Sequence, residues 1–211
     1  MLKPMPSLPR IILMALLPAG LASSVGAQAG HAPSSSPYRD ILQGHSLTFL
    51  VGSFAGNGGK LGIGPHHGTM YGVRYDIRLS NPMQVGFSGT RVGLERFIVD
   101  ADDSVATRRK GPVSQSLVAA EMALQWNLTG KKTWHGLAPY FGGSIGVAFA
   151  GDTRADTSGY RFGTKMVVGP NVGFRLFVTR RLHLRGEARQ SYWKLKYPSA
   201  YLDEPSKQPG T

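Results

Sequence analysis

Residues 68 to 79 read G-T-M-Y-G-V-R-Y-D-I-R-L. Every second residue from Tyr71 to Leu79 is apolar, and three of the residues between them, Arg74, Asp76 and Arg78, are charged. Successive side chains of a β-strand point to opposite faces. The segment is therefore predicted to be a strand with one apolar and one charged face. It fits a soluble sheet, whose apolar face points inward, or an outer-membrane barrel, whose apolar face meets lipid.

Six other segments show the same alternation and are predicted to be strands. They cover residues 46–54, 83–94, 118–128, 137–149, 165–178 and 182–192. In the segment that starts at Met83 the apolar phase changes near Gly89 to Arg91, and this predicts a β-bulge there. Pro170 is unusual within a predicted strand, because proline cannot donate a ladder hydrogen bond.

The connections between these segments alternate in length. Long connections cover residues 55–67, 100–113 and 151–162, and short ones cover 80–82, 129–136 and 179–181. Outer-membrane barrels combine short periplasmic turns with longer external loops. With the N-terminus in the periplasm, all six connections fall on the expected side.

The polar faces carry charges, whereas the opposite faces carry bulky residues such as Leu124, Trp126 and Phe141. An eight-stranded barrel is only just wide enough to be filled by side chains, so a row of bulky residues on every strand would overfill it. We therefore expect an all-β, antiparallel up-and-down transmembrane β-barrel with its charges in the lumen. The predicted lumen charge network consists of Arg74, Asp76, Arg78, Glu121, Arg175, Arg185, Glu187 and Arg189.

Residues 1–29 have the features of a cleaved secretory signal peptide. Lys3 and Arg10 are basic, a short apolar run begins at Ile11, and Ala27-Gln28-Ala29 forms an A-x-A cleavage site. The apolar run is shorter than the ~20 residues that a transmembrane helix needs. Residues 30–45 are polar and are expected to form a flexible periplasmic leader, and residues 46–197 the barrel.

The chain has a formal net charge of +12 and no cysteine. Without cysteine there is no disulfide framework, thiol nucleophile or lipid-modified cysteine. A basic excess suggests nucleic acid or an anionic membrane, and export makes nucleic acid an unsuitable partner. Lipopolysaccharide phosphate is the expected anionic neighbour, with Arg108, Arg109 and Lys110 in the second external loop as its candidate contacts.

On these patterns the chain resembles the small eight-stranded outer-membrane barrels of the outer-membrane protein A and X type. The resemblance covers residues 46–197 and rests on strand pattern, loop alternation and the signal, without a sequence signature. It implies location in the bacterial outer membrane, insertion by the barrel-assembly machinery, and a monomer if the chain is complete. Its members share an architecture more than an activity.

The chain departs from this family in its strand number, because seven strands are visible and single-chain bacterial barrels have an even number. Residues 198–211 show no apolar alternation and are interpreted as the remnant of a fourth external loop. The eighth strand is therefore missing at the C-terminus, and we expect the sequence to derive from a truncated gene.

The sequence predicts a non-enzymatic barrel with a structural or surface-interaction role through its long external loops. The alternatives are a lipid-modifying enzyme similar to the lipid A deacylases and a narrow small-solute pore. His183 and Ser191 lie eight residues apart on one strand, about 26 Å, too far to form a catalytic set with Glu187. His66 and His67 have no further ligand nearby in sequence. No catalytic, cofactor-binding or metal-binding residue is assigned, and the lumen charges are interpreted as a salt-bridge plug or as a gated ion path.

Overall fold

The computed structural model describes residues 36–59, 62–99, 103–104, 107, 109–151, 156 and 160–196. The predicted signal peptide, the start of the predicted leader and residues 198–211 lie outside the described residues. The described strands all belong to one compact unit that begins at Pro37.

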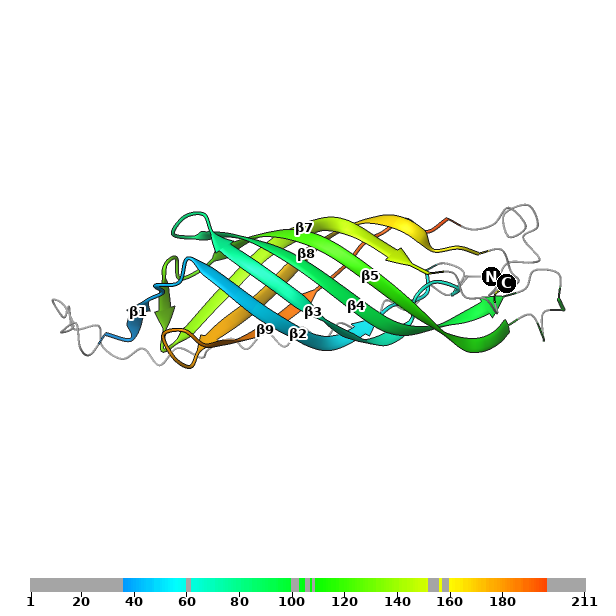
Figure 1. Ribbon diagram of the computed structural model, residues 1–211, viewed down its shortest axis with the longest axis horizontal. Helices are drawn as coiled ribbons and strands as arrows, with labels where there is room; N and C mark the ends of the chain where they lie inside the picture. The colour runs from blue at the N-terminus through cyan, green and yellow to red at the C-terminus, as the bar shows by residue number, and fades with distance from the viewer. Residues whose placement is uncertain are drawn as a thin grey trace, which may run out of the picture. The chain divides into compact units, whose positions relative to one another are not determined.

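The described residues form a nine-stranded antiparallel β-sheet (Figure 1). Seven long strands correspond to the seven predicted ones, so the all-β, antiparallel fold class is confirmed. No described helix is long and apolar enough to cross a membrane. The strands are β1 (Tyr38–Asp40), β2 (His45–Ala55), β3 (His67–Arg78), β4 (Met83–Val99), β5 (Arg109–Asn127), β6 (Lys132–Trp134), β7 (Leu137–Ala150), β8 (Gly163–Phe177) and β9 (His183–Arg189).

The long strands follow one another in the sheet in the order of the sequence, β2-β3-β4-β5-β7-β8-β9, and each neighbouring pair is antiparallel. This is an up-and-down arrangement. Among the described residues no ladder joins β2 to β9, so the sheet is not closed and these two strands are its edges.

Two short strands were not predicted. β1 pairs with β6, with Tyr38 opposite Trp134, and β6 lies in the connection between β5 and β7. The amide of Ile41 donates to the carbonyl of Lys131 (2.7 Å), and the Arg78 guanidinium donates to the carbonyl of Ile41 (2.6 Å). The segment expected as a flexible leader is therefore hydrogen-bonded to the sheet at its C-terminal end.

The predicted bulge at Gly89 to Arg91 is wrong. The register of β4 against both neighbours is continuous there, and it shifts between Arg96 and Ile98 instead. Val92 and Leu94 lie on the same buried face as Gln84 and Ser88. The apolar phase changes because this face becomes apolar along the strand, not because the strand gains a residue.

Pro170 lies opposite Gly143 in the middle of β8. Its carbonyl accepts a hydrogen bond from Gln190 (3.1 Å), so its backbone faces β9. The β8–β9 ladder ends at Arg189, directly before Gln190. Beyond the proline, pairing continues only as an isolated bridge between Val168 and Tyr192, so the missing donor coincides with an interruption of the ladder.

Candidate functional site: the inner face of the sheet

The outer face of the sheet is apolar and exposed. Phe49 and Val51 on β2 are 80% and 85% exposed, and large apolar side chains continue around the other long strands. Contiguous exposed apolar surface of this extent marks a membrane or protein contact. The exposed outward residues include Leu47, Tyr71, Val73, Tyr75, Phe87, Met122, Phe141, Ile145, Val147, Phe149, Val168, Val172, Phe174, Leu176 and Leu184.

The inner face carries buried charges that begin with Arg74 and Asp76 of β3. Arg74 Nε lies 2.7 Å from Asp76 Oδ1, and both side chains are almost fully buried. The other carboxylate oxygen of Asp76 lies 3.3 Å from Arg185 Nη1 of β9. A buried charge is tolerated only when it is paired, and Asp76 has a basic partner on each oxygen.

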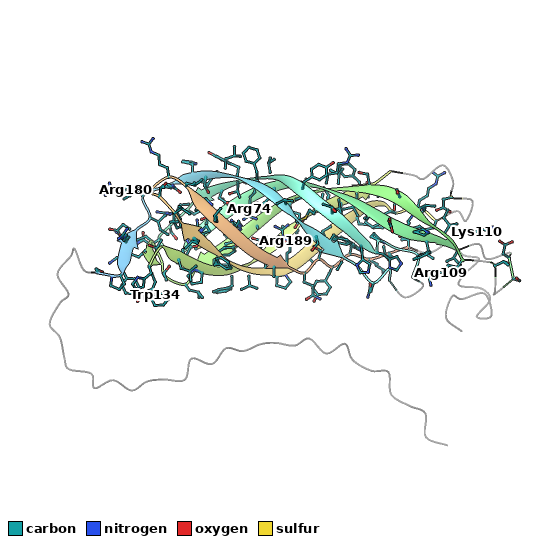
Figure 2. All side chains as sticks on the ribbon, turned by 90° about the horizontal axis from the view of Figure 1, so that it is seen from below. Arg74, Arg109, Lys110, Trp134, Arg180 and Arg189 are labelled. Carbon is teal, nitrogen blue, oxygen red and sulfur yellow. The ribbon has the colours of Figure 1, made fainter. Side chains whose placement is uncertain are left out.

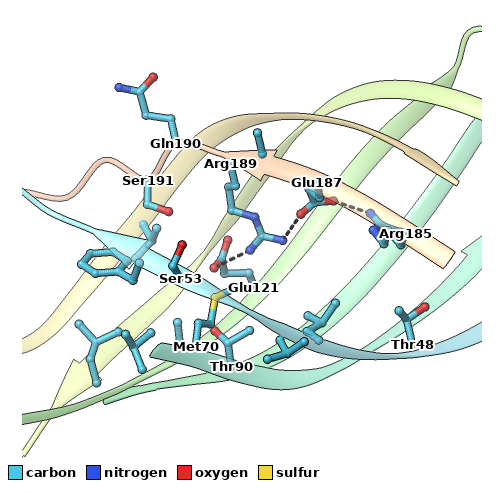
Figure 3. A pocket seen from close by; sticks show the side chains of 18 of the residues that line it. Thr48, Ser53, Met70, Thr90, Glu121, Arg185, Glu187, Arg189, Gln190 and Ser191 are labelled. Atoms are coloured by element: carbon cyan, nitrogen blue, oxygen red, sulfur yellow. Dashed lines mark hydrogen bonds and ion pairs between the residues drawn. The ribbon is translucent and has the colours of Figure 1, made fainter. Parts of the chain in front are cut away.

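Glu187 of β9 is the centre of the network (Figure 3). It accepts hydrogen bonds from Arg185 (2.5 Å), Arg189 (2.7 Å) and the hydroxyl of Tyr140 (2.8 Å). Arg189 also pairs with Glu121 of β5 at 2.8 Å. Three alternating residues of one strand thus form a chain of ion pairs that ends on a strand across the inner face.

Neutral side chains complete this network. Arg175 of β8 donates to Gln84 Oε1 (2.7 Å) and to Asn127 Oδ1 (2.6 Å), and Gln125 donates to Asn171 (3.0 Å). These bonds connect β8 with β4 and β5, although β7 lies between β5 and β8 in the sheet. The sheet is therefore strongly curved around its inner face.

Seven of the eight predicted network residues have ion-pair or hydrogen-bond contacts with other inner-face side chains. Arg78 is the exception, because it donates to the backbone of Ile41 at the end of the sheet. Tyr140 and the amide side chains of Gln84, Gln125, Asn127 and Asn171 were not predicted as site residues. Their parity, which matches that of the charged residues, was the signal available in the sequence.

The inner face is not charged along its whole length, in contrast to the predicted charge-filled lumen. Beyond Glu121 most buried side chains of β4, β5, β7 and β8 are apolar, with Thr90 at the near end of this region and Gln115 and Arg96 at its far end. We call this cluster the apolar tier and the charged network the polar tier. The apolar tier consists of Val92, Leu94, Leu117, Ala119, Ala148, Phe162 and Val167, with Phe54, Met70, Ala150, Trp193 and Leu195 packed against it.

Arg96 lies on β4 beyond the apolar tier. It pairs with Asp156, and its guanidinium lies 5.3 Å from the ring centre of Tyr160. Arg96 and Asp156 are both almost fully buried at this ion pair. The apolar tier therefore lies between Glu121 of β5 on one side and the Arg96–Asp156 ion pair on the other.

The predicted lipopolysaccharide contacts lie at the start of β5, at one end of the sheet. Figure 2 shows Arg109 and Lys110 there, with Trp134 and Arg180 at the opposite end. Arg109 stacks on Phe97 (3.8 Å to the ring centre), and Lys110 pairs with Asp103 at 2.6 Å. Arg108 lies outside the described residues.

The histidines of the described ranges are spread over several elements. His183 begins β9, whereas Ser191 lies beyond the end of this strand. His66 has its Nε2 2.8 Å from the Gly62 carbonyl and packs edge-on against Phe97. Within the described ranges no group of three or more His, Cys, Asp or Glu residues could hold a metal ion.

A cavity of about 1690 Å³ lies between the two edges of the sheet. Its walls are β2 on one side and residues 181–195 on the other, and its floor includes Glu121 of the polar tier and Val92 and Leu117 of the apolar tier. Figure 3 shows Arg189 and Glu121 facing this space. Residues of both tiers are thus accessible from this cavity.

No protein-family model, curated protein or solved structure matches the chain.

Proposed function

We propose that the chain is a small outer-membrane β-barrel protein without enzymatic activity, with a structural or surface-interaction role in the bacterial envelope. One observation carries this proposal: the same strands expose large apolar side chains outward and bury charged side chains inward. A soluble sheet has the opposite arrangement. In lipid, by contrast, an apolar outer surface and a polar interior are the stable combination.

The pairing of the interior charges supports a plug over an ion path. Asp76 and Glu187 each contact at least two arginine side chains, and the apolar tier lies beyond them. A permeating ion would have to separate buried ion pairs and then pass a region lined mainly by apolar side chains. Both steps are unfavourable where the local dielectric is low.

We assign the surface role to the end of the sheet with the longer connections, those between β2 and β3, β4 and β5, and β7 and β8, and call it the loop end. Arg109 and Lys110 lie at this end. These cations fit the phosphates of lipopolysaccharide in the outer leaflet. The short turns between β3 and β4 and between β8 and β9 would then face the periplasm.

Fractionation of cells that express the exported chain tests the membrane assignment. We expect the protein in the outer-membrane fraction, extracted by detergent and not by high salt, because its contacts would be with hydrocarbon. It should migrate differently on gels before and after heating, because a folded barrel resists detergent. Recovery of a monodisperse, detergent-free form from the periplasm would overturn the proposal.

A further inference from the structure

The cavity of about 1690 Å³ between β2 and β9 has a polar level and an apolar level. Six antiparallel pairings separate β2 from β9 in the sheet, so these two strands run in the same direction. Along β2 the lining changes from Thr48 to Phe54, and along β9 and the residues after it from Arg189 to Trp193. Both walls therefore change from polar to apolar toward the same end of the cavity.

Glu121 contributes an unpaired acceptor to the polar level. Its Oε1 lies 2.8 Å from Arg189 Nη1, and its side chain is only 6% exposed. Its Oε2 is buried and has no hydrogen-bond partner among the described residues, although the residue lines the cavity (Figure 3). A buried charged acceptor without a partner is costly. An N–H or O–H donor of a ligand in the cavity would satisfy this atom.

Three further buried atoms of the cavity lining make no hydrogen bond within the part of the chain that the structure describes. They are Thr48 Oγ1, His183 Nε2 and Arg185 Nε. A guanidinium Nε only donates, a carboxylate oxygen only accepts, and a hydroxyl does both. Arg185 and Arg189 are four residues apart, about 13 Å along the strand. A single hydroxyl cannot reach atoms spread over this distance, whereas a group with several hydroxyls can.

The charges that line the cavity favour an uncharged ligand group. Two basic residues, Arg185 and Arg189, alternate with Glu187 and face Glu121, and all four already take part in ion pairs. An anion beside Arg189 would also lie beside both carboxylates, and a cation beside Glu121 would also lie beside Arg189. Either charge would compete with existing buried pairs. Hydroxyl groups can bind here without separating them.

The apolar tier provides the adjoining space for a hydrocarbon chain. Val92, Leu117 and Val167 are buried residues of this tier that line the cavity. At the same level the rings of Phe54 and Trp193 stack 5.9 Å apart. Moving methylene groups from water to such surroundings is favourable. A molecule that fits both levels is therefore polar at one end and apolar at the other.

The cavity also reaches the outer face of the sheet. Its lining includes Val51 and Leu184, which are exposed there, and no described ladder joins β2 to β9. A ligand dissolved in a bilayer could therefore enter between these two strands without passing through the ion pairs of the polar tier.

We propose that this cavity binds a single-chain amphiphile with an uncharged polyhydroxyl head group of the sugar type. The head group contacts Thr48, Arg185 and Glu121, and the chain lies against the apolar tier. This site goes beyond the proposed structural and surface role, because it gives the inner face of the sheet a ligand of its own.

Tryptophan quenching tests the binding. The double variant Trp126→Phe/Trp134→Phe leaves Trp193 as the single tryptophan of the chain. The protein is reconstituted in vesicles, and an alkyl maltoside with a brominated chain is added, since bromine quenches indole only at close contact. We expect saturable quenching, half complete at a mole fraction about tenfold below that needed for bulk-lipid quenching.

The matched control is Trp134→Phe/Trp193→Phe, which retains Trp126. Trp126 lies on the outer face, where it stacks on the exposed Phe141, so it reports the bulk lipid. Its quenching should rise in proportion to the mole fraction without saturation. The same unsaturable quenching of Trp193 would overturn the proposal.

Head-group specificity is tested on the protein with Trp193 alone. The same brominated chain is supplied as a methyl ester, a carboxylate and a quaternary ammonium. We expect each to bind about tenfold more weakly than the maltoside, because none can donate a hydrogen bond to Glu121. Equal affinities would mean that only the chain is recognised and would contradict the assigned head group.

Two variants test the two levels of the cavity separately. Glu121→Gln replaces a charge-assisted hydrogen bond with a neutral one and should narrow the preference for maltoside over methyl ester about fivefold. Glu95→Gln on the outer face of β4 is its control and should leave the preference unchanged. An unchanged preference in Glu121→Gln would remove Glu121 from the site.

Ala119→Phe fills the apolar level, because Ala119 is buried and lines the cavity. It should weaken maltoside binding about tenfold or more. Ala120→Phe is its control, because Ala120 is the next residue and is exposed on the outer face. Equal affinities of these two variants would overturn the placement of the chain. If Ala119→Phe does not fold, the head-group series on the Trp193 protein decides.

These outcomes are separate from those of the membrane proposal. If fractionation yields a soluble form, quenching is measured in buffer. Saturable quenching in that form would support the cavity site and contradict the membrane assignment. A heat-shifted monomer in outer membranes whose Trp193 shows no saturable quenching would do the reverse.

Discussion

Glu187 shows how a single residue organises the polar tier. It accepts hydrogen bonds from two arginines and one tyrosine, and these donors come from β7 and β9. Removing a carboxylate from such a site leaves buried cations without a counterion, and this costs more than the net contribution of the intact pair.

We therefore predict that Glu187→Leu lowers the free energy of unfolding by about 3–5 kcal/mol. Glu95→Leu is the matched control, because Glu95 is exposed on the outer face of β4 and should change stability by no more than about 0.5 kcal/mol. Urea unfolding in detergent, followed by tryptophan fluorescence, measures both. Similar losses in the two variants would show that Glu187 does not hold the network together.

Substitutions of Val73 and Thr90 compare the two faces of the sheet at the same level along the strands. Val73 lies opposite Gly89, next to Thr90, but Val73 is exposed on the outer face and Thr90 lines the inner cavity near Glu121. We predict that Val73→Lys reduces stability in lipid vesicles by about 2–4 kcal/mol, the cost of a cation on a lipid-facing strand near the midplane.

Thr90→Lys should cost clearly less, because its ammonium can approach the free oxygen of Glu121. The folded yield of each variant in vesicles, read by heat modifiability, provides the comparison. If the two variants fold equally well, or if Thr90→Lys is the worse, the outer face does not contact lipid.

At the scale of the element, the alternation of apolar and polar residues was sufficient to predict all seven long strands and which side chains share a face. It was not sufficient to locate the bulge. When the inner face of a strand changes from polar to apolar, the sequence pattern looks the same as when a bulge inserts one extra residue. Val92 and Leu94 demonstrate this: they face inward like Ser88, and only the continuous ladders to β3 and β5 reveal it.

The short strands and the bonding partners were also beyond prediction, for a physical reason. β1 and β6 have three residues each, too few for a period to be read. The pairing of Arg175 with Gln84 spans 91 positions and depends on the curvature of the sheet, which no local pattern contains. The sequence therefore identified the charged members of the polar tier but not which residues they pair with.

The apolar tier supplies a prediction on β5. Leu117 is 2% exposed in this tier, whereas Leu128, just beyond the other end of the strand, is 66% exposed. We expect Leu117→Ala to reduce the free energy of unfolding by about 2–5 kcal/mol, because it leaves a cavity among packed side chains. Leu128→Ala should change it by about 0.5 kcal/mol or less. Equal effects in chemical denaturation would mean that the tier is loosely packed.

At the scale of the whole molecule, basic side chains lie at both ends of the sheet. Arg109 and Lys110 lie at the loop end, and Arg180 and Arg181 form the turn between β8 and β9 at the other end. The membrane proposal gives these two pairs different surroundings, because lipopolysaccharide is confined to the outer leaflet.

We predict that the double variant Arg109→Ala/Lys110→Ala weakens binding of lipopolysaccharide to the vesicle-inserted protein about tenfold. Each basic residue near an anionic membrane surface contributes about 1 kcal/mol, and the pairing of Lys110 with Asp103 reduces its share. Arg180→Ala/Arg181→Ala is the control and should leave affinity unchanged when lipopolysaccharide is added from the loop side. Titration monitored by fluorescence measures both affinities. If Arg180→Ala/Arg181→Ala weakens lipopolysaccharide binding more than Arg109→Ala/Lys110→Ala, the proposed orientation of the protein in the membrane is reversed.

The boundary between the polar and apolar tiers also controls how far one strand can slide along another. A slip of one residue turns a strand inside out and is prevented by the alternation itself. A slip of two residues keeps every side chain on its own face, so alternation gives no protection against it. In this sheet such a slip would move Leu117 of β5 from the level of Val92 to that of Thr90, nearer to the charged residues, or, in the other direction, Glu121 from the level of Ser88 to that of Thr90, nearer to the apolar tier. The charged network and the apolar cluster therefore act together on strand register. They make the observed register more stable than registers that are shifted by two residues.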